Sequence, residues 1–282
     1  MMGSPGVEIK SAEQIVRMRR AGLVVAQALA AMGRAVRPGL TTGELDAVAR
    51  QVLAEHRATS SFLGYGADWD YPPYPATACI SVNEEVVHGI PGDRVLAEGD
   101  IVSIDFGAIV EGWHGDAART FAVGQITPDV AELVEVTRQA MWAGIAAAAS
   151  AARVGDISQA IQQYANQAGL GIVREYTGHG IGSAMHQPPD VPNYGRARRG
   201  PRLSKGMCLA IEPIFTMGQP MSVVLADEWT VVTQDGCWAS HWENTVALCE
   251  DGIWVLTEPD GGRAELAARG VQLSALADSA VK

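Results

Sequence analysis

Apolar positions recur at helical spacing in two stretches near the N-terminus, and each stretch follows a capping motif. Ser11 and Gln14 have the capping-box form, in which two side chains three residues apart satisfy free backbone N–H groups. Pro38-Gly39 ends the first stretch, and a second box, formed by Thr41 and Glu44, opens the next. The pattern therefore predicts two consecutive helices in this part of the chain.

The same order of signals recurs in the second half of the chain. Thr127-Pro128 places a cap before a proline at the first helical position, and Asp156 is expected to cap a further helix. Two copies of a helix–helix–sheet unit predict one α+β domain with internal pseudo-twofold symmetry. We place this domain at residues 11–258, between a short segment, residues 1–10, and a C-terminal tail, residues 259–282.

Strand-like runs of apolar and β-branched residues follow each pair of predicted helices. In the first half they cover Ala78–Val82 and Ile101–Val110, after a stretch rich in glycine, proline and aromatic residues, Gly64–Pro75, which we expect to be a loop. In the second half, strands are expected at Ile172–Tyr176, Met207–Phe215, Ser222–Leu225, Thr230–Thr233, His241–Leu248 and Trp254–Leu256.

Composition and charge narrow the class of protein. Of the 282 residues, 48% are hydrophobic and 19% are charged, which is typical of a globular protein. The formal net charge of −11 disfavours nucleic-acid binding. No segment approaches the roughly 20 apolar residues of a membrane span, and the N-terminus lacks the apolar run of a signal peptide. The four cysteines lack C-x-x-C spacing, so we expect free thiols and a cytoplasmic location.

The segment from Ile101 to Val123 carries the first candidate chemistry. Its apolar residues alternate as one buried face, so Asp105 lies on the other face. A two-residue turn at Glu111-Gly112 would place Asp116 on the same face, diagonally displaced by about 7–8 Å between backbones. Two such carboxylates repel each other unless a cation lies between them or one is protonated. From this hairpin alone, a metal site and two unrelated surface aspartates are equally good interpretations.

Two glutamates and a histidine extend the candidate set. Glu212 lies within an apolar run and Glu243 follows Trp242, and a buried glutamate is rare unless it is paired or binds metal. His179 lies between glycines, which suits an accessible ligand, although a lone histidine is more often structural. Four carboxylates and one imidazole form a hard, oxygen-rich set suited to Mn, Fe, Co or Zn.

Six motifs in order give the chain a family resemblance. It closely resembles the type I methionine aminopeptidases from about Ile9 to Leu256. The resemblance rests on Cys79-Ile80-Ser81-Val82-Asn83-Glu84, His88-Gly89-Ile90-Pro91, Asp105-x10-Asp116, Thr177-Gly178-His179-Gly180-Ile181-Gly182, Ile211-Glu212-Pro213 and Trp242-Glu243-Asn244-Thr245. Each motif alone is weak, but six in order with every ligand type present are a strong signal.

The resemblance implies a pita-bread fold with two divalent metal ions at its centre. By analogy Asp105 chelates one ion, Asp116 and Glu243 bridge both, and His179 and Glu212 complete the other. Glu212 would also act as the base, while His88 and His186 would contact the substrate and act in catalysis. The methionine pocket would be lined, together with these two histidines, by Tyr65, Tyr74, Cys79, Met185 and Trp229.

Some positions depart from the family pattern. Asn244 stands where a histidine is usual, and Met185 where an aromatic residue is common. The loop Gly66–Pro72 is longer than in the commonest form, which affects the assignment of Tyr65, and the tail beyond Pro259 has no counterpart in the minimal family.

Residues outside the proposed ligand set have simpler interpretations. His56, His114 and His241 are expected to be structural or exposed rather than catalytic. Cys79 is expected to face the pocket, where it could be alkylated.

Removal of the initiator methionine from nascent proteins with a small second residue is the implied function. The partners would be nascent polypeptide N-termini, with transient contact at the ribosome exit. The protein would be a monomer, and it would bind neither membranes nor specific nucleic acids.

Two classes of rival remain. Xaa-Pro aminopeptidases or dipeptidases of the same fold share the ligand types, but they usually carry a large N-terminal domain, and only about ten residues precede the first predicted helix here. A type II methionine aminopeptidase would need a large insertion between His179 and Glu212, which this spacing does not accommodate. The other class is a non-catalytic binding protein of the pita-bread fold, against which the complete ligand set argues.

Overall fold

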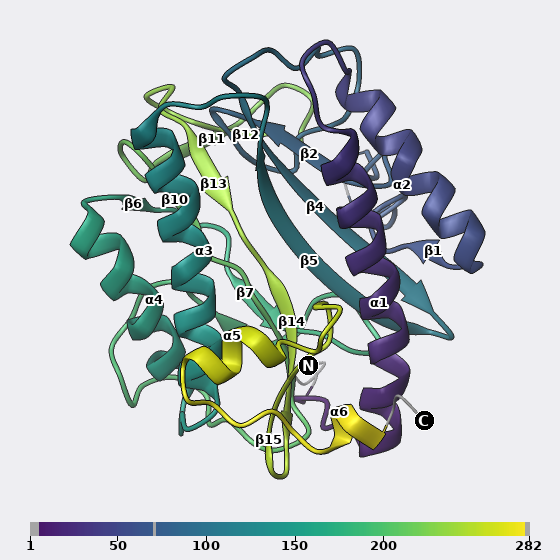
Figure 1. The fold of residues 1–282 in the computed structure, drawn as a ribbon, viewed down its shortest axis with the longest axis vertical. Coiled ribbons are helices and arrows are strands. Elements are labelled where there is room, and N and C mark those ends of the chain that lie inside the picture. The colour runs from purple at the N-terminus through teal and green to yellow at the C-terminus, as the bar shows by residue number, and fades with distance from the viewer. Residues whose placement is uncertain (1–5, 70–71, 280–282) are drawn as a thin grey trace.

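The computed structural model describes residues 6–69 and 72–279. Residues 1–5, 70–71 and 280–282 lie outside the described residues, and they include parts of the predicted N-terminal segment, of the predicted loop and of the tail. Two pairs of helices flank a central group of strands, with α1 and α2 on one side and α3 and α4 on the other (Figure 1). This is the α+β pita-bread arrangement in a single domain, as the sequence predicts.

The first half of the molecule forms as its sequence pattern indicates. α1 (Ala12–Ala35) and α2 (Thr42–His56) both begin with the predicted capping boxes, at Ser11 and at Thr41. Their apolar faces pack on a sheet whose order is β1-β4-β2, with β5 paired to β4. The strands of this sheet are β1 (Thr59–Ser60), β2 (Cys79–Val82), β4 (Ile101–Val110) and β5 (Trp113–Ala122).

The second half repeats the helix pair. α3 (Pro128–Ala148) has Thr127 at its cap position, and α4 (Val154–Ala168) ends at Gly169 in the left-handed conformation. The prediction that Asp156 caps α4 is wrong, because the helix begins two residues earlier. Arg153 occupies the cap position, and Asp156 instead accepts hydrogen bonds from the N–H groups of Ala152 and Arg153 at 3.0 Å.

α3 and α4 cover shorter strands that form two further sheets. The first has the order β13-β10-β6 and the second β15-β14-β9-β7-β8. Their strands are β6 (Gly171–Ile172), β7 (Gly178–Gly180), β8 (Gln187–Val191), β9 (Cys208–Ile211), β10 (Ile214–Thr216), β13 (Ala239–His241), β14 (Asn244–Cys249) and β15 (Gly252–Val255).

Two of the predicted strands are interrupted, and a third is cut to a fraction of its expected length. The predicted run Met207–Phe215 is broken between β9 and β10 at Glu212-Pro213, where proline has no N–H to donate to a strand ladder. His241–Leu248 is broken between β13 and β14, and Ile172–Tyr176 continues as a strand only to Ile172. The first two breaks matter for function, because each carries one of the candidate glutamates.

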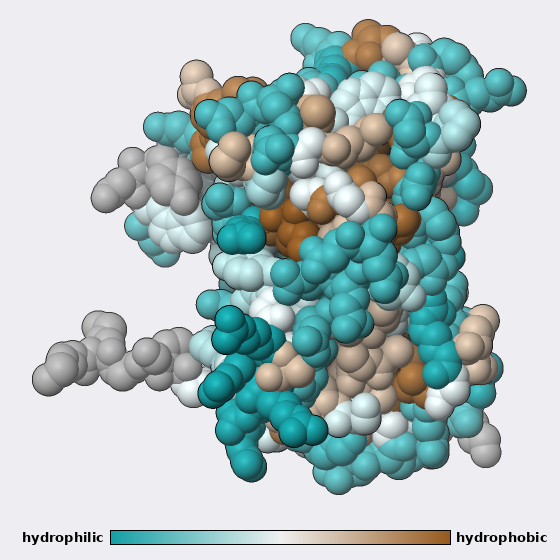
Figure 2. Space-filling model, turned by 90° about the vertical axis from the view of Figure 1, so that its left-hand side faces the viewer, coloured by the Kyte–Doolittle hydropathy of each residue, from teal (hydrophilic) through white to brown (hydrophobic). Residues whose placement is uncertain are grey.

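A small sheet lies at the top of the molecule in Figure 1. Its order is β11-β12-β3, formed by β11 (Ser222–Val224), β12 (Val231–Thr233) and β3 (Glu85–Val87). Met221, Val223, Val224 and Leu225 are exposed along β11 and its ends. The face drawn in Figure 2 is largely hydrophilic, with its most hydrophobic residues gathered mainly in the upper half.

The C-terminal part packs back onto the helices. It contains α5 (Arg263–Ala268) and α6 (Leu276–Ser279), and Leu266 is fully buried in the second-half core. The guanidinium group of Arg19 in α1 donates hydrogen bonds to the carbonyl oxygens of Leu256, Glu258 and Pro259, at 2.7, 2.6 and 2.9 Å. Among the helices in the described ranges, none has the length and apolar character needed to cross a bilayer.

Candidate metal centre

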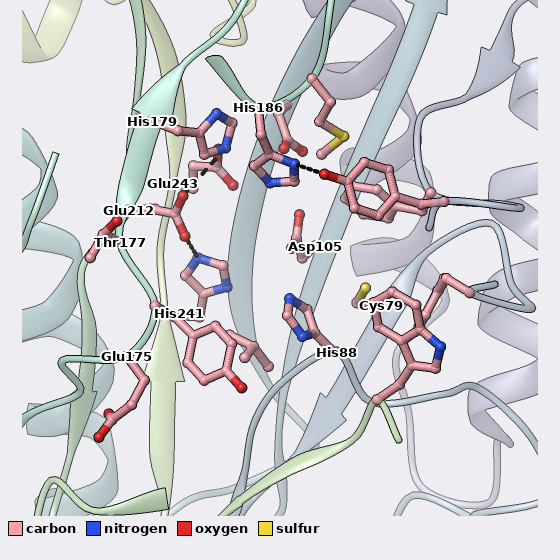
Figure 3. Close-up of a pocket in the computed structure, with 18 of the residues that line it drawn as sticks. Cys79, His88, Asp105, Glu175, Thr177, His179, His186, Glu212, His241 and Glu243 are labelled. Atoms are coloured by element: carbon pink, nitrogen blue, oxygen red, sulfur yellow. Dashed lines mark hydrogen bonds and ion pairs between the residues drawn. The ribbon is translucent and has the colours of Figure 1, made fainter. Parts of the chain in front are cut away.

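A cavity of about 640 Å³ opens between the two halves of the fold. Every site residue predicted from the sequence lines it. These residues are Tyr65, Tyr74, Cys79, His88, Asp105, Asp116, His179, Met185, His186, Glu212, Trp229 and Glu243. They come from both halves of the chain, so the fold brings together groups that are far apart in sequence (Figure 3).

The β4–β5 hairpin places the two aspartates. Asp105 pairs with Ala118 and Gly107 pairs with Asp116, which is the register predicted from the two-residue turn. Both carboxylates are withdrawn from solvent, and the Oδ1 atom of each has no hydrogen-bond partner among the described residues. Burial raises the pKa of Asp105 to about 7. Burial, and then the charge of Asp105, raise the pKa of Asp116 well above its usual range.

The two glutamates occupy the strand breaks. Glu212 follows β9, and Asn193 donates a hydrogen bond from its amide nitrogen to the Glu212 carbonyl at 2.9 Å. Glu243 precedes β14, and its N–H donates to the carbonyl of Ala118 at 3.0 Å, which ties it to β5 beside the aspartates. Burial raises the pKa of Glu212 to about 8 and that of Glu243 well above its usual range. Interrupted strands therefore turn both carboxylates into the cavity.

Two glycines let the strand that carries His179 fit between its neighbours. A Cβ on Gly178 would lie 2.4 Å from the carbonyl oxygen of Ala210, and one on Gly180 would lie 2.3 Å from that of Pro188. The His179 Nδ1 is 3.0 Å from the Gly180 carbonyl oxygen, so it acts as the donor and leaves Nε2 free as an acceptor. Burial lowers the pKa of His179 to about 3, which keeps the imidazole neutral.

The ligand atoms converge closely enough to share a metal ion. One ligand atom each from Asp116, His179 and Glu243 lie within 4.8 Å of one another. The Nε2 of His179 is 3.5 Å from Oε1 of Glu212, and Oε1 of Glu243 has no hydrogen-bond partner within the described chain. Buried, unpartnered carboxylate oxygens are costly without a compensating positive charge. The donor set therefore fits a divalent metal ion.

Two further histidines approach from the other walls of the cavity. The His186 Nδ1 lies 2.5 Å from the hydroxyl of Tyr65. His88 has a positive φ of 58°, and its ring meets those of Tyr176 and Trp229 edge-on, with centroids 5.2 and 6.0 Å apart. Burial lowers the pKa of both histidines to about 4. A strained backbone conformation held in this way is typical of functional positions.

An apolar end of the cavity adjoins these histidines. Its buried residues are Phe62, Tyr74, Ala76, Cys79, Met185 and Trp229, with Tyr65 and Ile90 packed against them. Trp229 donates from its indole nitrogen to the carbonyl of Pro72 at 2.8 Å, which connects the aromatic wall to the loop that follows α2. Cys79 lies in this wall as expected, and burial raises the pKa of its thiol well above the usual range. We therefore expect the thiol to be protonated and slow to react with alkylating reagents.

His241 lines the cavity although the sequence analysis did not include it in the site. This histidine was expected to be structural or exposed, yet it is buried and lines the cavity, with Nε2 3.6 Å from Oε2 of Glu212. Its spacing of two residues from Glu243 is the signal that could have placed it on the same side of the strand. By contrast, His56 is exposed at the end of α2, and the His114 Nδ1 contacts the Ser61 hydroxyl at 2.9 Å.

Comparisons with known proteins agree with this geometry. Residues 16–250 match the model of Metallopeptidase family M24. A methionine aminopeptidase of Clostridium acetobutylicum is 48% identical over 250 residues, which cover 88% of this chain and 98% of that protein. Methionine aminopeptidase 1 of Mycobacterium tuberculosis is 47% identical over 264 residues, covering 91% and 97%.

Among solved structures, this chain resembles methionine aminopeptidases closely and prolidases only distantly. The crystal structure of methionine aminopeptidase from Thermotoga maritima matches with a TM-score of 0.86 at 40% identity, covering 90% of this chain and 100% of that one. The prolidase from Pyrococcus furiosus matches with a TM-score of 0.68 at 21% identity, covering 89% of this chain and 65% of that one. The second likeness shows a common fold and carries no argument about substrate.

Proposed function

The chain belongs to the methionine aminopeptidases of metallopeptidase family M24, and on that premise we propose that it removes the initiator methionine from nascent proteins with a small second residue. One observation carries the proposal. The convergence of Asp116, His179 and Glu243 within 4.8 Å lies in the same cavity as an apolar, aromatic and sulfur-rich end. A metallohydrolase centre beside a pocket for a thioether side chain is what such an enzyme needs.

Five side chains would hold two divalent metal ions, which could be Mn, Fe, Co or Zn. We assign Asp105, Asp116, His179, Glu212 and Glu243 to them as ligands. The support is the burial of Asp116, His179 and Glu243, the unpartnered oxygen atoms of the two aspartates and of Glu243, the free Nε2 of His179, and the position of all five side chains in the cavity lining. When bound, such ions supply Lewis acidity to the scissile carbonyl and to the attacking water.

The protein's own groups would move protons and hold the substrate. Glu212 would accept the proton of the attacking water, because its carboxylate faces the cavity and its backbone is held by Asn193. His186 would donate to the developing oxyanion. The Tyr65 hydroxyl occupies its Nδ1, which leaves Nε2 for the substrate. His88 would contact the nitrogen of the scissile amide.

The apolar end of the cavity would select methionine. An unbranched thioether side chain adapts to irregular space and makes favourable contacts with aromatic rings. Tyr74 and Trp229 meet edge-on at 5.2 Å, and the sulfur atoms of Cys79 and Met185 belong to the same cluster. Because His88 lies beside this wall, it would fix the distance between the methionine side chain of the substrate and the scissile bond.

We expect methionine to be released from Met-Ala-Ser and no residue to be released from Ala-Pro-Ala. The physical reason is that the apolar end accepts a thioether, whereas alanine would leave it unfilled. Liquid chromatography of the free amino acids after incubation with metal-loaded protein measures both outcomes. Release from Ala-Pro-Ala would instead favour an Xaa-Pro peptidase, and no release from either peptide would favour a non-catalytic binding protein.

A further inference from the structure

His241 is held rigidly by its backbone at the end of β13. Its N–H donates to the hydroxyls of Thr120 at 3.1 Å and Ser103 at 3.3 Å, and the Thr120 hydroxyl donates to its carbonyl oxygen at 2.9 Å. Ser103 and Thr120 lie 2.8 Å apart across the β4–β5 ladder, and Ser240 contacts Thr120 at 3.0 Å. These buried hydroxyl groups fix the main chain from which the imidazole projects.

The imidazole of His241 points at one oxygen of Glu212. Its Nε2 lies 3.6 Å from Oε2, while the other oxygen, Oε1, lies 3.5 Å from Nε2 of His179 (Figure 3). Nε2 of His241 is fully buried and has no hydrogen-bond partner among the described residues. The Glu212 carboxylate is therefore placed between two imidazoles, one on each oxygen, and only one of these belongs to the proposed ligand set.

We infer that His241 is a positioning residue, which donates a hydrogen bond from Nε2 to Oε2 of Glu212 and so directs Oε1 toward His179 and the metal centre. The inference rests on the proposed function, because it assigns a partner to the proposed base and ligand. Hydrogen bonds in catalytic sites are often long without ligands and tighten in the working complex. The 3.6 Å separation needs to shorten by only a few tenths of an ångström, roughly, to reach hydrogen-bond range.

A hydrogen bond from His241 would fix the orientation of the Glu212 carboxylate. A glutamate side chain has three rotatable bonds, so a carboxylate held only at its backbone can turn either oxygen toward the centre. A donor on Oε2 removes that freedom and leaves a single arrangement for proton transfer and ligation. Partners that orient metal ligands in this way typically contribute about 10–100-fold to metal affinity or activity.

Substitution at position 241 separates this role from simple packing. His241→Leu fills similar space without a donor and should lower kcat for Met-Ala-Ser by about 10–100-fold with KM little changed. His241→Gln restores a donor and should recover most of kcat. Trp242→Phe is the matched control, because it removes the neighbouring unpartnered ring N–H outside the cavity while Arg119 keeps a ring to stack on. It should behave as the wild type.

Metal binding gives a readout that does not depend on turnover. Calorimetric titration of metal-free protein with Mn²⁺ should show weaker binding in His241→Leu by about 10-fold. The same substitution should have no further effect in a Glu212→Ala background, because the acceptor is then absent. Should His241→Leu fail to fold, His241→Met supplies the same comparison.

The outcomes separate the inference from the function it rests on. If the wild type releases methionine and His241→Leu matches it in kcat and Mn²⁺ affinity, the inference is wrong and the function stands. Equal losses in His241→Leu and His241→Gln would also overturn it, because they would indicate packing rather than a donor. If the wild type releases no methionine, the proposed function fails, and the Mn²⁺ titrations alone decide the role of His241.

Discussion

His179→Ala is expected to abolish metal binding and activity together. In the proposed ligand set the imidazole is the single neutral nitrogen donor among four carboxyl groups, and its free Nε2 lies 3.5 Å from Oε1 of Glu212. Its removal leaves the carboxyl groups of Asp116 and Glu243 without the third member of the cluster that could hold an ion. Metal ions contribute several kcal/mol to transition-state stabilisation, so kcat/KM should fall by at least about 1,000-fold. Metal content by mass spectrometry and methionine release measure the two effects.

His88→Ala is the matched control for this prediction. It removes another cavity histidine of similarly lowered pKa, but one that lies against Tyr176 and Trp229 rather than among the carboxylates. The variant should retain its metal and lose kcat, by about 100-fold if His88 acts in proton transfer. A wild-type kcat would remove His88 from the mechanism, and normal metal content in His179→Ala would remove His179 from the ligand set.

Gly22→Ala is expected to destabilise the whole fold. A Cβ at this position would lie 2.1 Å from the carbonyl oxygen of Leu256, which is backbone and cannot rotate away. On the neighbouring strand, a Cβ on Gly115 would lie 2.8 Å from the Gly22 nitrogen, so α1 approaches β5 directly beside Asp116. Overpacking of this kind costs about 3 kcal/mol, which lowers Tm by about 6–12 °C for a chain of this size. Thermal unfolding of metal-free protein measures the shift.

Gly92→Ala provides the comparison for the glycine at position 22. An added Cβ at Gly92 meets nothing within 4 Å and its φ lies outside the left-handed region, so Tm should stay near that of the wild type. If both substitutions lowered Tm equally, the effect would come from the general loss of glycine rather than from the contact with Leu256. The claim that the fold depends on the close approach of α1 to Leu256 and β5 would then be wrong.

Local sequence signals were sufficient for the helices and for the aspartate hairpin. The boxes at Ser11 and Thr41 are complete within four residues, and the register that brings Asp105 and Asp116 together depends only on a two-residue turn. These features need no information from distant parts of the chain. The local interactions that form the helix caps and the hairpin are therefore visible in the sequence itself.

The break that carries Glu243 depends on distant contacts, whereas the break at Glu212 follows from the neighbouring Pro213 in the sequence. No proline or glycine next to Glu243 indicates the end of a strand there. The Glu243 N–H instead donates to the carbonyl of Ala118 on another sheet. The place of His241 in the cavity wall is hidden from the sequence for the same reason, because its burial follows from the packing of β13 against β4 and β5. Tertiary hydrogen bonds decided these positions, and single-sequence periodicity does not record them. The buried setting of Glu212 and Glu243 made them candidate ligands, and the family resemblance assigned each its role in the site.

The centre brings function at the expense of stability. Asp105, Asp116, Glu212 and Glu243 are buried together, and burial raises the pKa of each. A charged carboxylate is better solvated in water than in the protein interior. Without cations, burying these four groups therefore lowers the stability of the folded state. Ligands that bind only the folded state stabilise it by mass action. Divalent ions should therefore support the fold as well as the chemistry.

Stripping and restoring metal tests the central claim most directly. Methionine release from Met-Ala-Ser is followed in protein treated with chelator, dialysed, and then titrated with Mn²⁺ in a calorimeter. The account predicts no release from the stripped protein, binding of two ions per chain, and recovery of release as the sites fill. Undiminished release from protein shown by mass spectrometry to hold no metal would contradict it.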